Sequence, residues 1–279
     1  MSDYADELRD ASIDRVRIEI GAGVVEIAPV DGDETHAFLE VLHGSGEGWV
    51  EDITFRVVGG ELVVDTPKQS LRRSQEVRVR VETPGPIGAR IKTGSGDVVA
   101  TVPLTEPRLS TGSGDIRLDR ADGTTTVGTG SGDIRIAHTT GPARLNTGSG
   151  EIEVSRTDAL VAASTGSGDV RIGDAAGPVT IKVGSGDISI ERVLGHSVAT
   201  SGSGDVRVDR AEGPSVRAET ARGDVQVGVP EGLPTYLDLK TVTGTIRCDL
   251  EPGEQPAEGD PSLLLRARTV SGDITVVRV

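Results

Sequence analysis

The chain repeats a short turn motif at a fixed interval of 18 residues. The motif has the form Thr-Gly-Ser-Gly-acid, and its seven copies follow one another without slippage. The copies begin at Thr93, Thr111, Thr129, Thr147, Thr165, Val183 and Ser201. A fixed period over consecutive blocks indicates equivalent coils that stack along one axis. We therefore predict an all-β, single-domain parallel β-solenoid, of the β-helix or β-roll type, with 18-residue coils.

The block Thr165–Lys182 shows how one coil is built. Its first turn is glycine-rich, and glycine accepts backbone conformations that other residues avoid. Val170 and Ile172 then alternate with polar residues, which is typical of a strand with one buried face. Gly177-Pro178 marks a second bend, and residues 179–181 form the return strand. We expect the apolar positions of successive coils to form continuous ladders, worth about 1.5–3 kcal/mol for each buried side chain.

Two inward positions recur in every regular block. The first holds Val98, Ile116, Ile134, Ile152, Val170, Ile188 and Val206. The second holds Ala100, Leu118, Ile136, Val154, Ile172, Ile190 and Val208. The low aromatic content, 2%, fits a thin core filled by such aliphatic side chains.

The regular blocks divide the chain into four segments. Residues 1–13 are acidic and are expected to form a short helix or to be disordered. Residues 14–92 predict irregular β-rich coils and a cap, and residues 93–218 are the seven regular coils. Residues 219–279 predict irregular coils with an acidic loop at 251–262, which is rich in Pro and Gly.

Aromatic side chains lie only outside the regular coils of residues 93–218. Phe38, Trp49 and Phe55 precede the regular coils and Tyr236 follows them, which suggests caps over the ends of the stack. Cys248 falls two residues after Ile246, at the second inward position. We therefore expect its side chain to be a small buried hydrophobe.

The charge and the first residues limit the partners. A net charge of −15 repels nucleic acids and anionic membranes. The start of the chain has neither the basic nor the apolar region of a signal peptide, and no apolar run reaches membrane-spanning length. A single cysteine excludes an internal disulfide and a cysteine-based metal cluster. We expect a cytoplasmic protein, with surface association as the alternative.

The acidic residue of each turn is the most distinctive candidate for chemistry. The seven positions are Asp97, Asp115, Asp133, Glu151, Asp169, Asp187 and Asp205. Like charges stacked about 4.8 Å apart repel by roughly 1 kcal/mol per pair, so something must offset them. We interpret each acid as a cap for its own turn that also meets an arginine two residues on.

Calcium binding is the alternative reading of these acids. One carboxylate per coil is few for an ion that takes six to eight oxygens. We therefore predict no metal site and no cofactor, and name the acidic ladder as the place where Ca²⁺ would bind. The threonines before the turns are interpreted as satisfying turn backbone groups instead of forming an ice-binding face.

Catalytic motifs are not apparent. His36, His43, His138 and His196 are scattered, and the glycine turns match neither a nucleophile elbow nor a phosphate-binding loop. A polysaccharide-active enzyme, the alternative for a β-helix, would need a pocket near Trp49 or the Glu251–Ser262 loop. We predict no catalytic residues.

The recurrent Thr-Gly-Ser-Gly-Asp-[Val/Ile]-x-[Ile/Val] pattern, with its Gly-Pro bend, resembles the bacterial DUF4097 family of β-strand repeat proteins. That family is similar to head-GIN-domain proteins, and the resemblance is strongest over Thr93–Ala218. It implies a β-solenoid. Its members are often labelled candidate adhesins, which implies surface or carbohydrate binding and brings no catalytic motif.

The residues themselves favour a non-enzymatic scaffold or protein-interaction module with an acidic, repetitive surface. Its partners would be cationic proteins, or further copies of the chain that associate through the solenoid ends or edge. An adhesin-like surface or carbohydrate-binding protein is the alternative, and we expect neither nucleic-acid binding nor membrane insertion.

Overall fold

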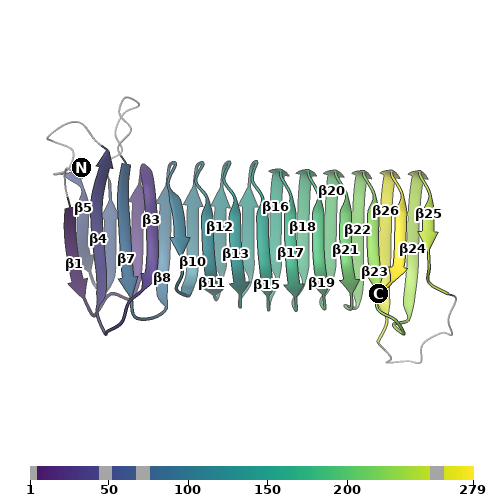
Figure 1. Ribbon diagram of the computed structural model, residues 1–279, viewed down its shortest axis with the longest axis horizontal. Helices are drawn as coiled ribbons and strands as arrows, with labels where there is room; N and C mark the ends of the chain where they lie inside the picture. The colour runs from purple at the N-terminus through teal and green to yellow at the C-terminus, as the bar shows by residue number, and fades with distance from the viewer. Residues whose placement is uncertain (1–4, 44–51, 67–75, 252–260) are drawn as a thin grey trace. The chain divides into compact units, whose positions relative to one another are not determined.

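The computed structural model describes residues 5–43, 52–66, 76–251 and 261–279 (Figure 1). These residues contain strands and turns and no α-helix, as an all-β solenoid requires. The sequence predicts a single domain, whereas the structure divides into two compact units, residues 1–140 and 141–279. Each coil of a solenoid contacts only its neighbours, so a boundary can fall within a run of regular coils.

The strands of the first unit are β1 (Ala5–Asp10), β2 (Arg15–Ile20), β3 (Ala22–Pro29), β4 (Thr35–His43), β5 (Thr54–Val58), β6 (Glu61–Asp65), β7 (Glu76–Thr83), β8 (Ile87–Thr93), β9 (Asp97–Ala100), β10 (Leu104–Thr111), β11 (Ile116–Asp122), β12 (Thr125–Thr129) and β13 (Ile134–Thr139). Those of the second unit are β14 (Ala143–Thr147), β15 (Ile152–Thr157), β16 (Val161–Ser167), β17 (Val170–Ala175), β18 (Val179–Ser185), β19 (Ile188–Val193), β20 (Ser197–Ser203), β21 (Val206–Ala211), β22 (Ser215–Arg222), β23 (Val225–Val229), β24 (Thr235–Thr243), β25 (Ile246–Cys248), β26 (Leu263–Ser271) and β27 (Ile274–Arg278).

The regular coils of the first unit form two parallel rows of strands. One row is β8–β10–β12 and the other is β9–β11–β13. Ile116 lies in register with Val98 on one side and Ile134 on the other, and all three are buried. The inward ladder predicted from the sequence is therefore confirmed here.

The start of the chain closes the first unit with antiparallel strands. β7 pairs in parallel with β3, β4 pairs antiparallel with β7, and β1 pairs antiparallel with β4. β5 forms an antiparallel pair with β6 in the other row. The expected helix or disorder in residues 1–13 is wrong for Ala5–Asp10, because β4 offers this segment a strand edge to pair with. Trp49, proposed as part of the cap, lies outside the described residues.

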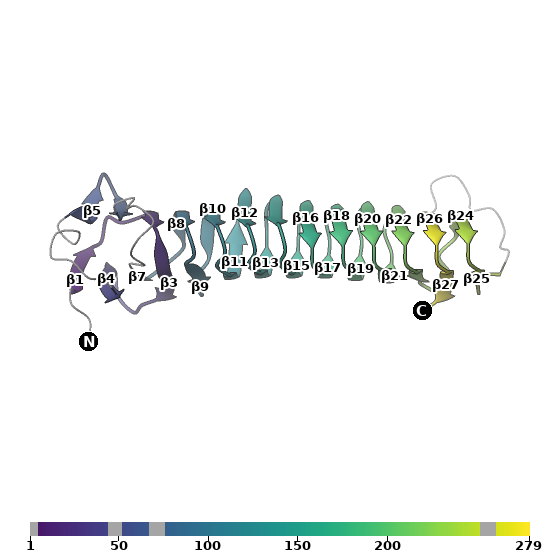
Figure 2. The ribbon, with the colours of Figure 1, turned by 90° about the horizontal axis from the view of Figure 1, so that it is seen from above.

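The second unit repeats the two-row arrangement (Figure 2). One row runs β14–β16–β18–β20–β22 and the other β15–β17–β19–β21–β23, all in parallel pairing. The inward residues of both rows are buried, including Ile152, Val170, Ile188 and Val206 at the first inward position. Gly204 shows why the turns need glycine: its φ is +136°, and an added Cβ would lie 2.1 Å from the Gly186 carbonyl oxygen.

The coils after residue 219 do not stack in chain order. β26 lies between β22 and β24, and β27 lies between β23 and β25. The later segment thus stacks on the regular coils, while β24 and β25 form a terminal coil beyond it. Cys248, predicted to be buried, is exposed because no further described coil covers its position.

Candidate functional site

The turn carboxylates join successive coils. In the second unit, Asp169 Oδ1 accepts a hydrogen bond of 2.9 Å from the backbone N–H of Asp187, and Asp187 Oδ1 accepts one of 2.8 Å from Asp205. The pattern continues through Asp224 and Asp273 to the backbone N–H of Thr245. Because each bond crosses to the next coil, the predicted capping of the acid's own turn is replaced by a bond between coils.

The first unit has the same bond between coils. Asp97 Oδ1 accepts a 2.9 Å bond from Asp115 N–H, and Asp115 Oδ1 accepts a 2.8 Å bond from Asp133 N–H. A hydrogen bond to a charged acceptor contributes roughly 1.5–3 kcal/mol, which offsets repulsion along the row. The turn carboxylates therefore stabilise the stack through one oxygen each.

Arginines two residues on neutralise only part of the row. Arg135 donates to Asp133 at 2.9 Å, and Arg171 donates to Asp169 at 2.9 Å while also pairing with Glu151. Arg207 instead pairs with Asp209. Asp187, Asp205 and Asp224 are exposed, and the described residues provide no ion pair for them. Three adjacent coils of the second unit thus carry unneutralised carboxylates.

The threonines that open the turns point into the coil. Thr111 accepts a bond from Gly114 N–H at 2.9 Å and donates to the Gly96 carbonyl oxygen at 3.2 Å. Thr129 repeats both contacts one coil later. These side chains are buried, so they satisfy backbone groups within and between turns.

Other candidate ligands remain dispersed. The described residues contain no group of three or more His, Cys, Asp or Glu side chains placed to hold one metal ion. His196 hydrogen-bonds Ser215 at 2.7 Å, and His36 stacks edge-on against Phe38. The absence of a metal site stays a prediction, with calcium binding at the acidic ladder as its alternative, and a calcium titration in solution would test it.

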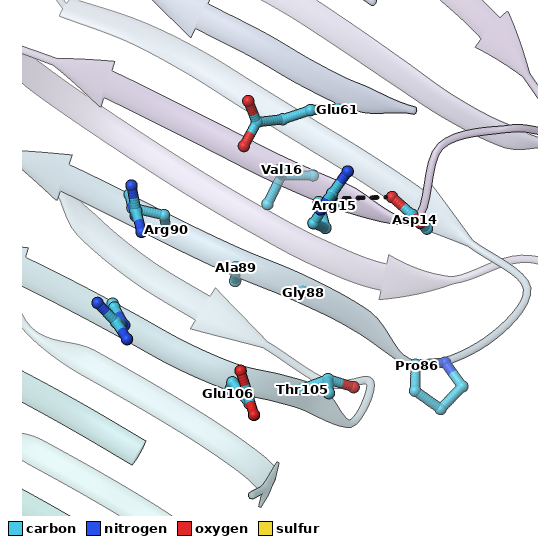
Figure 3. Close-up of a pocket in the computed structure, with 11 residues that line it drawn as sticks. Asp14, Arg15, Val16, Glu61, Pro86, Gly88, Ala89, Arg90, Thr105 and Glu106 are labelled. Atoms are coloured by element: carbon cyan, nitrogen blue, oxygen red, sulfur yellow. Dashed lines mark ion pairs between the residues drawn. The ribbon is translucent and has the colours of Figure 1, made fainter. Parts of the chain in front are cut away.

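A groove on the first unit gathers side chains that the sequence reasoning did not connect (Figure 3). It has a volume of about 390 Å³ and lies over β2, β8 and β10, at the outer face of their row. Arg90 and Arg108 occupy neighbouring register positions there and are both exposed. Arg15, by contrast, is paired with Asp14 at 3.2 Å.

Two local features accompany the groove: a position without a side chain and a backbone irregularity. Gly88 faces Arg15, and a Cβ at this position would lie 2.9 Å from Arg15 Cγ. The pairing of β10 with β8 shifts register between Thr105 and Arg108, and Glu106 adopts φ +47°. A non-glycine residue in this region carries strain of order 1–3 kcal/mol, and such strain is concentrated at functional sites.

Arg90, Arg108 and Glu106 form no ion pairs with other described residues. Guanidinium and carboxylate groups in one groove can donate to and accept from a hydroxyl-rich or mixed-charge ligand. The segment Thr101–Pro107 departs from the Gly-Pro bend of later blocks, and this departure is the sequence signal that could have located the groove.

The repeat has a counterpart among known protein families. The family model for Toastrack DUF4097 matches residues 87–176 and 164–277. The chain belongs to the Toastrack DUF4097 family. The matched ranges include both the regular coils and the coils that close the second unit, so the predicted resemblance and the β-solenoid class are confirmed. No curated protein matches the chain.

Two solved structures are similar to the chain over nearly its whole length. A candidate adhesin of Bacteroides fragilis has 13% identity and a TM-score of 0.43, with 100% of this chain and 98% of that chain covered. A candidate lipid-binding protein of Parabacteroides distasonis has 13% identity and a TM-score of 0.45, with 98% and 96% covered. Among the described residues of this Toastrack chain, no helix is long and apolar enough to cross a membrane.

Proposed function

We propose that this Toastrack protein is a non-enzymatic scaffold and protein-interaction module whose acidic, repetitive turn edge binds a basic segment of a partner protein. The observation that carries the proposal is that the turn carboxylates of Asp187, Asp205 and Asp224 bond the next coil through one oxygen and leave the other oxygen for a partner. One oxygen of each acid is held by the N–H of the next coil, while Asp187, Asp205 and Asp224 remain exposed without an ion pair in the described residues.

This arrangement suits recognition of a linear charged segment. Equivalent atoms of neighbouring coils repeat about every 4.8 Å, and the bonds between coils hold the carboxylates in place before a partner arrives. A partner therefore binds without first ordering three flexible side chains, which lowers the entropic cost of association. Attraction to the net charge of −15 would also speed the encounter of a cationic partner.

The test is a binding experiment with charge-neutral variants. The triple variant D187N/D205N/D224N keeps an oxygen acceptor at every position while removing three charges. Its control, E191Q/E231Q/D249N, removes three exposed acids away from the turn edge. Cationic proteins are first cross-linked to the wild type in native cytoplasm and then purified. They should bind the control variant as tightly as the wild type, and the turn variant at least tenfold more weakly. Equal binding by both variants would contradict the proposal.

The groove around Arg90 and Arg108 favours a second candidate, an adhesin-like carbohydrate-binding protein. Its mixed donors and acceptors fit sugar hydroxyls, as does the strained Glu106 beside them. Binding to immobilised glycans should then be lost in the variant R90A/R108A and retained in D187N/D205N/D224N. The cellular location separates the two candidates, because the scaffold is expected in the cytoplasm and the adhesin at the surface.

A further inference from the structure

The terminal coil, β24 and β25, leaves its core-facing side chains uncovered. Leu237 and Ile246 are 41% and 42% exposed. Their register partners one coil inward, Leu265 and Ile274, are fully buried. The outward residues Tyr236 and Val242 add further exposed apolar surface, at 48% and 67%. The described part of the chain thus ends in an open apolar face.

The backbone of β24 is also open along one side. Among the described residues β24 pairs with β26 alone. The Pro234 carbonyl oxygen accepts a 2.9 Å bond from Leu263 N–H, so position 234 faces β26. Because neighbouring residues of a strand point their N–H and C=O groups to opposite sides, Leu237, Leu239 and Thr241 direct theirs to the open edge.

The sequence of β24 is complementary to itself about Leu239. In an antiparallel pair centred there, Asp238 lies opposite Lys240 of a second copy, and Tyr236 lies opposite Val242. Leu237 meets Thr241, and Leu239 meets Leu239. Lys240 forms no ion pair in the described chain. Arg266 and Arg268 bind Asp238 through Oδ2, so the other oxygen of this carboxylate can accept a hydrogen bond from Lys240 of the second copy. Opposite charges directly across a strand pair are stabilising.

We propose that two copies of the chain associate through β24, which pairs antiparallel with its counterpart about a two-fold axis at Leu239. The backbone N–H and C=O of Leu239 point to the open edge, so Leu239 forms a hydrogen-bonded pair with Leu239 of the second copy. Leu237 of each copy forms the next such pair with Thr241 of the other. The pairing satisfies an exposed strand edge and covers Leu237 and Leu239. A two-fold contact of this kind is closed, so it produces a dimer and no filament.

The edge strand β1 of the first unit shows how charged side chains protect a strand edge. β1 pairs only with β4 among the described strands, and it carries Asp6, Glu7, Arg9 and Asp10. Charged side chains of this kind discourage strand addition. β24 has one acid and one lysine, and these match each other across the proposed axis. The contrast favours a second copy as the occupant of the β24 edge.

The first test is the mass of the full chain in solution. Sedimentation over a concentration series should give twice the chain mass, falling to a monomer on dilution. The variant Leu239→Asp, which brings two carboxylates together at the axis, should be monomeric at all concentrations. Leu264→Asp is the control, since Leu264 is 52% exposed and points outward from the neighbouring strand. A monomeric wild type, or a dimeric Leu239→Asp, would overturn the proposal.

Cysteine substitutions test the register of the two β24 strands without introducing a charge. In a Cys248→Ser background, Leu239→Cys places two thiols at the axis, where Cα atoms of a hydrogen-bonded pair lie about 5.5 Å apart. Lys240→Cys places them two residues out of register, about 8 Å apart, which is beyond disulfide reach. Oxidation should cross-link the first variant and leave the second as single chains. Cross-linking of both variants equally, or of neither, would refute this pairing.

Discussion

An interior coil and the terminal coil of the second unit follow one sequence pattern but have opposite environments. At the first inward position, Ile188 lies between Val170 and Val206 and is 1% exposed. At the equivalent position, Ile246 has Ile274 as its one register partner among the described residues and is 42% exposed. Burial in a solenoid therefore depends on having a coil on both sides, which the residue's own block does not specify.

The largest expected effect comes from placing a charge at these two positions. Ile188→Asp buries a carboxylate between two aliphatic neighbours and should reduce the free energy of unfolding by more than about 4 kcal/mol. Ile246→Asp leaves its carboxylate at the open face, where water reaches it. It should cost less than about 1 kcal/mol in the monomer. Urea denaturation followed by circular dichroism measures both values.

Equal destabilisation by the two substitutions would mean that the terminal coil is covered in solution. The comparison should therefore be made at a concentration where sedimentation shows single chains. Ile188→Val serves as the mild control, with an expected loss of about 0.5–1.5 kcal/mol.

A smaller effect on the free energy of unfolding is expected at the turn carboxylates, where substitutions by Ala and by Asn separate the hydrogen bond from the charge. Asp187→Ala removes the acceptor for Asp205 N–H, and an unsatisfied donor costs about 1–3 kcal/mol where it is shielded from water. Exposure of this turn should keep the loss near 1 kcal/mol. Asp187→Asn keeps the acceptor and removes repulsion from Asp169 and Asp205, so its unfolding free energy should equal or exceed that of the wild type.

Thermal unfolding of the two variants provides the measurement. If Asp187→Asn destabilises the protein as much as Asp187→Ala does, the fold requires the negative charge and does not depend on the hydrogen bond between coils. At the terminal coil, the corresponding bond is Thr245 N–H to Asp273 Oδ1, at 2.8 Å. Asp273→Ala should therefore loosen the terminal coil, visible as faster amide exchange in β25, with little change in global unfolding.

The periodic positions explain which parts of the fold could be predicted from the sequence. The spacing of Ile116, Ile134 and Ile188 predicted the coil, its inward ladder and the β-solenoid class, because a repeat interacts with equivalent residues in its neighbours. The order of the last coils could not be predicted this way. The sequences around Ile246 and Ile274 are each compatible with stacking on Val225, and only the structure shows that Ile274 does so. That is why Cys248 was assigned to the interior.

The candidate sites show a similar division. The turn acids were recognised as a row, but a hydrogen bond from Asp205 N–H to Asp187 depends on the rotation of one coil over the next, which residue spacing does not determine. The groove was missed because Arg90 and Arg108 belong to different blocks and Gly88 contributes only by lacking a side chain. The strand at Ala5–Asp10 was missed because its pattern is set by β4, a partner distant in sequence.

The smallest expected effect concerns the acids that tie coils together by ion pairs. Hydrogen bonds from Arg192 and Arg210 lower the pKa of Glu212 between interior coils. The hydrogen bond from Arg268 lowers the pKa of Asp238 in the terminal coil. A carboxyl with a lowered pKa in the folded protein stabilises it fully above the ordinary range, about 4.3 for Glu and 3.9 for Asp. That contribution is lost as the pH falls through and below this range.

Melting temperature between pH 6 and pH 3 tests the comparison. The melting temperature of Glu212→Gln should fall less steeply with acidification than that of the wild type. The reason is that this variant lacks the ion pairs of Glu212 with Arg192 and Arg210 at every pH. Asp238→Asn should leave the global melting curve close to that of the wild type, since the coil that contains Asp238 has a described neighbour on one side only. Its effect should appear as faster amide exchange in β24 at pH 6, a difference from the wild type that shrinks as Asp238 becomes protonated. Parallel melting curves for wild type and Glu212→Gln would show that the ion pair between interior coils contributes nothing measurable.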